Sequence, residues 1–228
     1  MCDPTPKIVA IFDLDGTLYT GHVARGLAQH HTAHRVKRLM LYTYFALHMT
    51  LWFLGSLVRA SELSLRRIWA KHMGWLVRGW TPEQAAQAFV WIAEHYVSPL
   101  VRQDVLARVR QHQQAGHRTI LVSGTPAPLL QAIGHELGIE ETVGTPLVLR
   151  RGRYSGASEL PICQGPGKVA RLESHLQGGG PIDWSKSYTY ADSMIDLAIL
   201  ELAGNPVAVY PDEQLREHAV NQGWEILD

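Results

Sequence analysis

One stretch near the start of the chain, residues 8–18, constrains the fold more than any other. Its first five residues, Ile-Val-Ala-Ile-Phe, are apolar and mostly branched or aromatic, which is typical of a strand buried on both faces. Asp13 and Asp15 follow at once, with Gly16 and Thr17 behind them. Side chains two apart on an extended chain share a face, so both carboxylates should point into one site. In open α/β folds, ligands bind at the carboxyl ends of the strands, where these residues lie.

Two neighbouring carboxylates repel each other unless a cation lies between them or one of them carries a proton. A polar Asp-Gly turn after a strand is the plain structural alternative, but a turn needs no second Asp two residues earlier. We therefore interpret Asp13 and Asp15 as candidate site residues that require complementary groups elsewhere in the chain.

The composition sets bounds on the class of protein. The chain has 228 residues, 46% of them hydrophobic, which suits one α/β core with a smaller insertion. Lys plus Arg and Asp plus Glu number 21 each, so nothing favours nucleic-acid binding. The only cysteines, Cys2 and Cys163, lack metal-ligand spacing, as expected in a reducing cytoplasm. A strand is expected within a few residues of the N-terminus, so we expect no signal peptide and a cytoplasmic location.

Between the first strand and residue 97 the sequence predicts helices. A capping box at residues 81–84 begins a helix that extends to about residue 96, and an earlier helix is expected over residues 61–78. We therefore divide the chain into an α/β core, residues 1–20 and 97–228, and an inserted all-helical cap domain, residues 21–96.

The most hydrophobic stretch runs from Leu39 to Val58 and carries no formal charge, although basic residues flank it. Its length and composition match a transmembrane helix. A single span would separate Asp13 from the later motifs that belong to the same site, and the stretch is too short to cross a bilayer twice. We favour a buried cap helix with a dimer contact, and keep a peripheral membrane contact or an apolar substrate pocket as alternatives.

After residue 99 helices and strands alternate, which predicts a Rossmann-like, doubly wound parallel sheet with helices on both faces. We expect strands over residues 118–122, 187–190, 206–210 and 224–227, and a hairpin over residues 147–155. Helices are expected over residues 101–115, 127–137 and 212–222, with one that begins at Lys168 and one that follows residue 197 and ends at Leu202.

Further polar groups follow strands or glycine turns at three points: Ser123 with Gly124, Lys168, and Asp192 with Asp196. Carboxylate oxygens are ligands that Mg²⁺ prefers. A hydroxyl, backbone N–H groups and a lysine are groups that bind phosphate. Each residue alone has an ordinary structural role, but the ordered set predicts one site for a metal and a phosphate.

This ordered set resembles the haloacid dehalogenase-like hydrolase superfamily over nearly the whole chain. The strand with Asp13-x-Asp15-Gly-Thr is similar to its first motif, and Leu-Val-Ser123-Gly is similar to its second. Lys168 and Asp192-Ser-x-x-Asp complete the third and fourth motifs. A helical insertion between the first two motifs is similar to the phosphoserine-phosphatase-like branch.

Two departures from the family pattern lie near the fourth motif. Ala191 stands where the family usually has Gly, and Ala198 where it often has Pro. The methyl group of Ala191 would crowd the backbone beside the metal. Neither change removes a reacting group.

The resemblance implies a Mg²⁺-dependent phosphomonoesterase that forms an aspartyl-phosphate intermediate. Asp13 would attack phosphorus, and Asp15 would protonate the leaving oxygen and then activate water. Mg²⁺ would bind Asp13, the backbone carbonyl of Asp15, and Asp192, while Asp196 would support Lys168 or metal-bound water. The implied phosphate-binding residues are Thr17, Ser123, Gly124 and Lys168.

The cap residues bear on the small phosphorylated substrate. No acidic residue lies between Asp15 and Glu62, whereas His22 and Arg25 lie just after the first motif. This pattern favours an anionic or neutral leaving group, and the apolar stretch allows a lysophosphatidate-like lipid phosphate. Phosphoserine and histidinol phosphate remain alternative substrates. A phosphotransferase, or a non-catalytic membrane-associated protein that binds a phosphorylated ligand, remains the alternative of another class.

Overall fold

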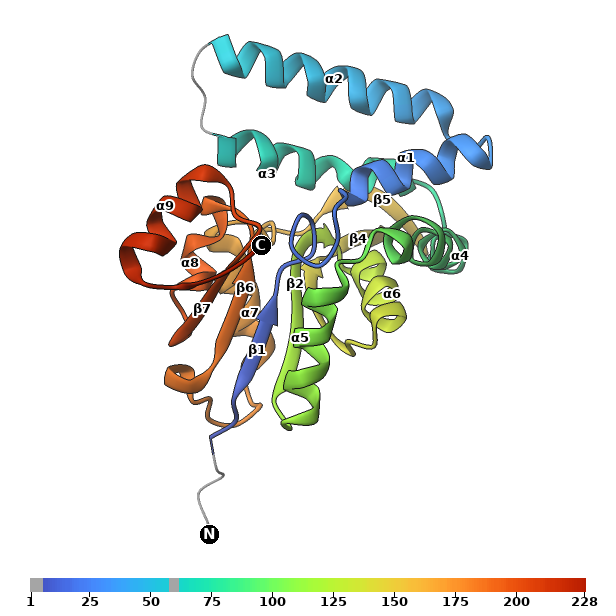
Figure 1. Ribbon diagram of the computed structural model, residues 1–228. Helices are drawn as coiled ribbons and strands as arrows, with labels where there is room; N and C mark the ends of the chain where they lie inside the picture. The colour runs from blue at the N-terminus through green and yellow to red at the C-terminus, as the bar shows by residue number, and fades with distance from the viewer. Residues whose placement is uncertain (1–5, 58–61) are drawn as a thin grey trace.

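A computed structural model describes residues 6–57 and 62–228 of the chain. Six parallel strands form one sheet in the order β3-β2-β1-β6-β7-β8, with β1 inside it (Figure 1). This arrangement confirms the predicted Rossmann-like α/β fold. The strands are β1 (Val9–Phe12), β2 (Arg118–Pro126), β3 (Glu141–Thr145), β6 (Tyr188–Ala191), β7 (Asn205–Val209) and β8 (Glu225–Leu227).

Helices cover both faces of the sheet because β1 has apolar side chains on both sides. Ala10 and Phe12 face one layer, and Val9 and Ile11 face the other. The first layer contains α5 (Gln103–Gln114) and α6 (Ala127–Leu137). The second contains α7 (Pro166–Leu176), α8 (Leu197–Leu200) and α9 (Glu213–Gln222).

The register of the sheet brings distant motifs to one edge. Phe12, the last residue of β1, pairs with Leu121 of β2 and with Tyr190 of β6. The residues that follow these three positions therefore leave the sheet side by side. The backbone N–H of Asp13 also donates to the Tyr190 carbonyl, with 2.9 Å between nitrogen and oxygen.

Three helices lie across this edge of the sheet, above the carboxyl ends of the strands (Figure 1). They are α1 (Val23–Ala33), α2 (Arg38–Leu57) and α3 (Glu62–His72). The next helix, α4 (Pro82–Ile92), begins at the predicted capping box and packs beside α6. The division between core and cap at residues 21 and 96 stays a prediction.

The helices of this region differ from the sequence prediction at their ends. After α3 the chain tightens into a 3₁₀ helix (Met73–Val77), and after α4 it widens into a π-helical turn (Ala93–Val97). Three positions used in the sequence analysis lie outside the described residues. They are Cys2, the end of the apolar stretch at Val58, and the expected helix start at residue 61. Neither α2 nor any other helix in the described part of the chain combines the length and the apolar character needed to cross a membrane.

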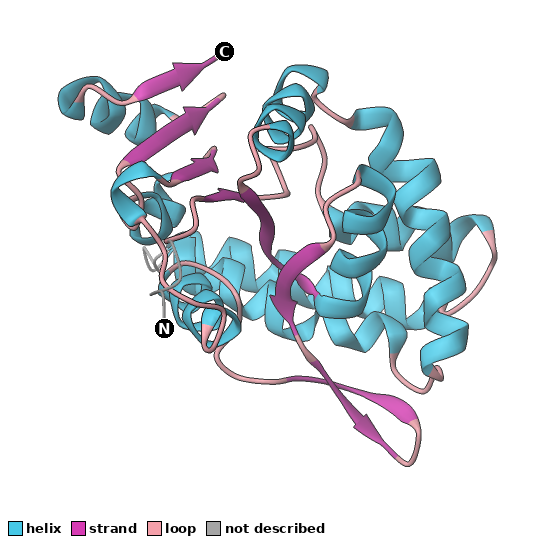
Figure 2. Ribbon diagram, turned by 90° about the horizontal axis from the view of Figure 1, so that it is seen from below, coloured by secondary structure: helices cyan, strands magenta, loops and turns pink. Residues whose placement is uncertain are grey.

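The predicted hairpin is present as β4 (Leu147–Arg150) and β5 (Arg153–Ser158), which project from the sheet as a separate ribbon (Figure 2). Two features of the sheet differ from the prediction. Strand β3 is not among the predicted strands, because Glu-Thr-Val-Gly-Thr is short and weakly apolar, as an edge strand can be. Strand β2 continues to Pro126, with a register shift after Val122.

Candidate active site

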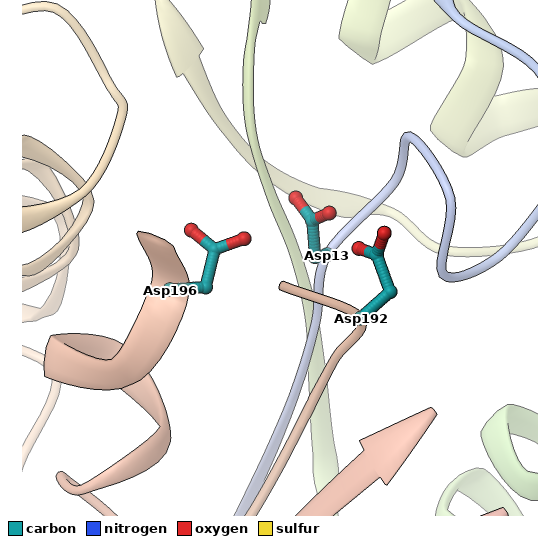
Figure 3. Close-up of side chains that lie close together, drawn as sticks. All are labelled: Asp13, Asp192 and Asp196. Carbon is teal, nitrogen blue, oxygen red and sulfur yellow. The ribbon is translucent and has the colours of Figure 1, made fainter. Parts of the chain in front are cut away.

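Three carboxylates converge at the edge of the sheet where β1 and β6 end. One carboxylate oxygen from each of Asp13, Asp192 and Asp196 lies within 4.8 Å of the others. Figure 3 shows that these side chains come from the end of β1, the loop after β6 and the short turn before α8. Asp13 and Asp196 are buried. Oxygen ligands gathered in this way suit a small, hard cation such as Mg²⁺.

Lys168 supplies the only positive side chain that contacts this cluster among the described residues. Its Nζ atom lies 2.6 Å from Asp13 Oδ1 and 2.8 Å from Asp196 Oδ1. Pro166 begins α7, and Gly165 before it has a φ of +54°, a conformation that glycine adopts with little strain. This turn places Lys168 in the first turn of α7, where it is 3% exposed.

One lysine does not neutralise three carboxylates. Burial raises the pKa of Asp13 to about 8, although Lys168 opposes the shift. Burial likewise raises the pKa of Asp192 to about 6, against the hydrogen bond from Thr17. Burial alone would lower the pKa of Lys168, but Asp13 and Asp196 together raise it. The excess negative charge and the oxygen donors fit a bound Mg²⁺ at this position.

Asp15 is held apart from the cluster by a separate set of contacts. Its Oδ1 atom accepts hydrogen bonds from the Tyr19 hydroxyl at 2.7 Å and from the Val23 backbone N–H at 3.1 Å. Its Oδ2 atom lies 4.0 Å from His22 Nδ1. Burial raises the pKa of Asp15, while His22, Tyr19 and Val23 all oppose that shift. A carboxyl group with a raised pKa is suited to donate a proton.

Three of the four predicted phosphate-binding residues line the cavity, and the fourth, Thr17, contacts the carboxylates instead. Ser123 and Gly124 line the pocket together with Lys168. Thr17 is fully buried, and its hydroxyl donates to Asp192 Oδ1 at 2.9 Å and to Asp13 Oδ2 at 3.5 Å. Thr17 therefore orients the two carboxylates here, and its contact with phosphate stays a prediction.

Gly16 is the position in this site where a side chain would not fit. Its φ is +87°, and a Cβ atom built there would lie 2.2 Å from Asp192 Oδ2. The backbone of the first motif thus passes directly against the carboxylate of the fourth. Ala191, the departure from the family pattern, ends β6 with its methyl group in a buried cluster that includes Leu200 and Ala208.

A cavity of about 500 Å³ opens above the carboxylates. The two cap residues expected near the substrate, His22 and Arg25, both line it. The cavity is also lined by side chains that the sequence alone did not assign to a site. They are Phe45, Met49 and Trp52 of α2, Arg66, Trp69 and Met73 from α3 and the following turn, and Gln164 of the core.

The sequence could not identify these cavity-lining residues, because their orientation depends on how the helices pack. The apolar stretch was open to interpretation as a substrate pocket, but which of its residues face the site depends on how α2 packs. The sequence of residues 61–78 likewise predicted a helix without indicating that Trp69 faces the cavity.

The site is built at the edge of a parallel sheet, with an aspartate directly after the central strand β1. A family model described as haloacid dehalogenase-like hydrolase matches residues 10–201. The chain belongs to the haloacid dehalogenase-like hydrolase family, as its motifs indicated, and its relatives support placing it among the phosphatases of that family.

Three similar proteins illustrate this placement. The inhibition of morphological differentiation protein of Streptomyces azureus is 29% identical, covering 98% of this chain and 79% of that protein. A histidinol-phosphatase of Neisseria meningitidis is 32% identical, covering 69% of this chain and 72% of that protein. A crystal structure of a Bordetella pertussis protein of unknown function is 26% identical, with a TM-score of 0.83 over 98% of this chain and 99% of that one.

Proposed function

We propose that this chain is a Mg²⁺-dependent phosphomonoesterase that works through an aspartyl-phosphate on Asp13. One observation carries the proposal: the Asp13 carboxylate lies between Lys168 and Asp192 at the floor of a cavity that Asp15 also lines. A nucleophile, a phosphate-binding cation, metal ligands and a proton donor thus share one space.

The two half-reactions follow from these positions. A carboxylate oxygen of Asp13 attacks phosphorus, the bond from phosphorus to the ester oxygen breaks, and Asp15 gives its proton to the departing alcohol. Asp15 then takes a proton from water that attacks the acyl phosphate, which releases phosphate and regenerates Asp13. Lys168 would hold phosphoryl oxygens, and Mg²⁺ on Asp13, Asp192 and the Asp15 carbonyl would offset repulsion between the anions.

The cavity above the floor supports a particular class of leaving group. Among the described residues that line it, the acidic ones are the four aspartates of the floor, whereas His22, Arg25 and Arg66 line the upper part beside aromatic walls. An ammonium group on the substrate would meet no carboxylate among the described side chains of that upper part. We therefore propose a phosphate ester with an apolar or anionic organic part, such as an acyl-glycerol phosphate.

Histidinol phosphate is the second candidate substrate, because the Neisseria relative carries that name. Its imidazole ring could stack on Trp52 or Trp69 in the upper cavity. Its amino group would need a polar partner there. Phosphoserine would need a carboxylate partner for its ammonium group.

The test has two stages. The first is phosphate release from p-nitrophenyl phosphate with Mg²⁺ and with excess EDTA, where loss of activity on chelation is expected. The second compares kcat/KM for a short-chain acyl-glycerol phosphate below its micellar concentration, histidinol phosphate and phosphoserine. Strong preference for phosphoserine would contradict the proposed substrate class, and Mg²⁺-independent release would contradict the proposed chemistry.

A further inference from the structure

The outer surface of α2 is unusually apolar for a helix that faces water. Of the thirteen large hydrophobic side chains exposed in the described part of the chain, seven lie on α2. We name five of them the α2 outer face: Leu39, Tyr42, Leu47, Met49 and Leu54, which are 41–78% exposed. Exposed apolar patches of this kind mark interaction surfaces more often than chance.

The opposite side of α2 already has its partners. Tyr44 and His48 are buried, and Tyr44 donates a hydrogen bond to the Trp69 carbonyl of α3 at 3.0 Å. His48 Nε2 lies 3.1 Å from His72 Nδ1 at the end of α3. A surface helix packed in this way should be polar on its outer side, as amphipathic helices are. The apolar outer face is therefore not needed to hold α2 in place.

The charged side chains of α1 and α2 all have one sign. No acidic residue occurs between Asp15 and Glu62, so α1 and α2 carry none. Arg35 and Arg38 are exposed at the N-terminal end of α2, and Arg25 is exposed on α1. A helix with an apolar face and neighbouring basic side chains has the character of segments that lie in the headgroup region of an anionic bilayer.

The α2 outer face is continuous with the wall of the cavity. Met49 belongs to both, since it lines the cavity and is 57% exposed. Phe45 and Trp52, four residues before and three after it, are neighbours of Met49 on the helix surface and also line the cavity. An apolar chain could therefore pass from the outer face into the cavity without crossing a polar barrier on α2.

We propose that the α2 outer face docks on an anionic lipid surface. Docking presents the mouth of the cavity, beside Met49, to the bilayer, with the basic N-terminal end of α2 at the headgroups. The docking itself does not depend on the proposed phosphatase activity. Only the delivery of a lipid phosphate to Asp13 rests on that proposed function. A second copy of the chain could cover the same apolar residues, but its α1 and α2 carry no acidic residue that would pair with the basic side chains.

Vesicle flotation tests the docking. The full chain is mixed with vesicles of phosphatidylglycerol or phosphatidylcholine, with Mg²⁺ present. We expect binding to the anionic vesicles that weakens at high salt, and little binding to phosphatidylcholine. The double variant Leu39→Gln/Leu54→Gln should bind anionic vesicles at least about tenfold more weakly than the wild type, because two apolar contacts with the bilayer are lost. The matched variant Leu149→Gln/Val220→Gln changes two exposed apolar residues elsewhere, 50% and 65% exposed, and should bind as the wild type does.

Several results would overturn the proposal. They are no flotation of the folded wild type, equal binding to both lipids, or equal loss in the two double variants. Sedimentation supplies a further arm: a wild-type dimer that Leu39→Gln/Leu54→Gln dissociates would assign the face to a second copy of the chain. Hydrolysis of soluble p-nitrophenyl phosphate is measured for every variant without vesicles. Docking with no hydrolysis would refute the proposed function alone, and hydrolysis with no docking would refute this inference alone.

Discussion

Replacement of Lys168 by methionine should destabilise the fold far more than an ordinary lysine substitution. Methionine fills similar space, so the main change is electrostatic. Lys168 Nζ lies 2.6 Å from Asp13 and 2.8 Å from Asp196, and the lysine and both aspartates are buried. Removing one partner of a buried ion pair typically costs about 3–5 kcal/mol, because the remaining charges lose compensation in a poorly solvated site. We expect the free energy of unfolding to fall by about that amount.

Urea denaturation monitored by tryptophan fluorescence measures this change in chelated buffer at pH 7.5. Lys186→Met is the matched control, because Lys186 is 70% exposed and pairs with Asp183 at 3.2 Å in solvent. That control should cost less than about 1 kcal/mol. Adding Asp196→Asn to Lys168→Met should recover about 1–2 kcal/mol, since it removes one of the uncompensated charges. A Lys168→Met protein within about 1 kcal/mol of the wild type would refute the reasoning.

Three shorter predictions test other parts of the structure. Tyr19→Phe removes the hydroxyl that donates to Asp15. Because a hydrogen bond to a charged group is lost, kcat should fall by about tenfold with little change in the fold. An unchanged steady-state kcat would contradict this prediction. Gly16→Ala should weaken Mg²⁺ activation, measured by titration, because its methyl group would displace the carboxylate after β6, whereas Gly152→Ala, also at positive φ but in open space, should leave it unchanged. Burial lowers the pKa of His112 to about 4 from the value of 6.5 expected in the unfolded chain, so between these two values the unfolded chain binds more protons than the folded one. The free energy of unfolding should therefore decline from pH 6.5 toward pH 4.5. A His112→Gln variant whose decline is as steep would exclude His112 as a cause.

The core of the site could be predicted because its residues follow strands. The apolar run of β1 fixes a buried central strand, and the parallel register then brings Asp13 beside Asp192. A lysine after a glycine turn is not distinctive by itself, so Lys168 could be predicted only as one member of the ordered set of polar groups. The structure places it within hydrogen-bond distance of Asp13, which the sequence implied only through the resemblance to a family.

The remaining features depend on how helices pack. The bond from Tyr19 to Asp15 forms because the chain turns back on itself after the first motif. The Asp-Gly pair marks a turn there, but it does not indicate which side chain the turn brings back to Asp15. The apolar stretch was interpreted as a buried helix, but only one side of α2 is buried. Nearly every residue of the stretch is apolar, so its periodicity could not show which side packs against α3 and which side lies outward.

The central claim is that Asp13 carries the phosphoryl group during turnover. Wild type, Asp13→Asn and Asp15→Asn are each mixed with p-nitrophenyl phosphate and Mg²⁺, quenched in acid within one turnover, digested and examined by mass spectrometry. We expect one phosphoryl group on the peptide that contains Asp13 in the wild type and none in Asp13→Asn. Asp15→Asn should show more label, because p-nitrophenol leaves without a proton donor while water lacks its base. A phosphoryl group on any other residue, or turnover by Asp13→Asn at the wild-type rate, would contradict the central claim.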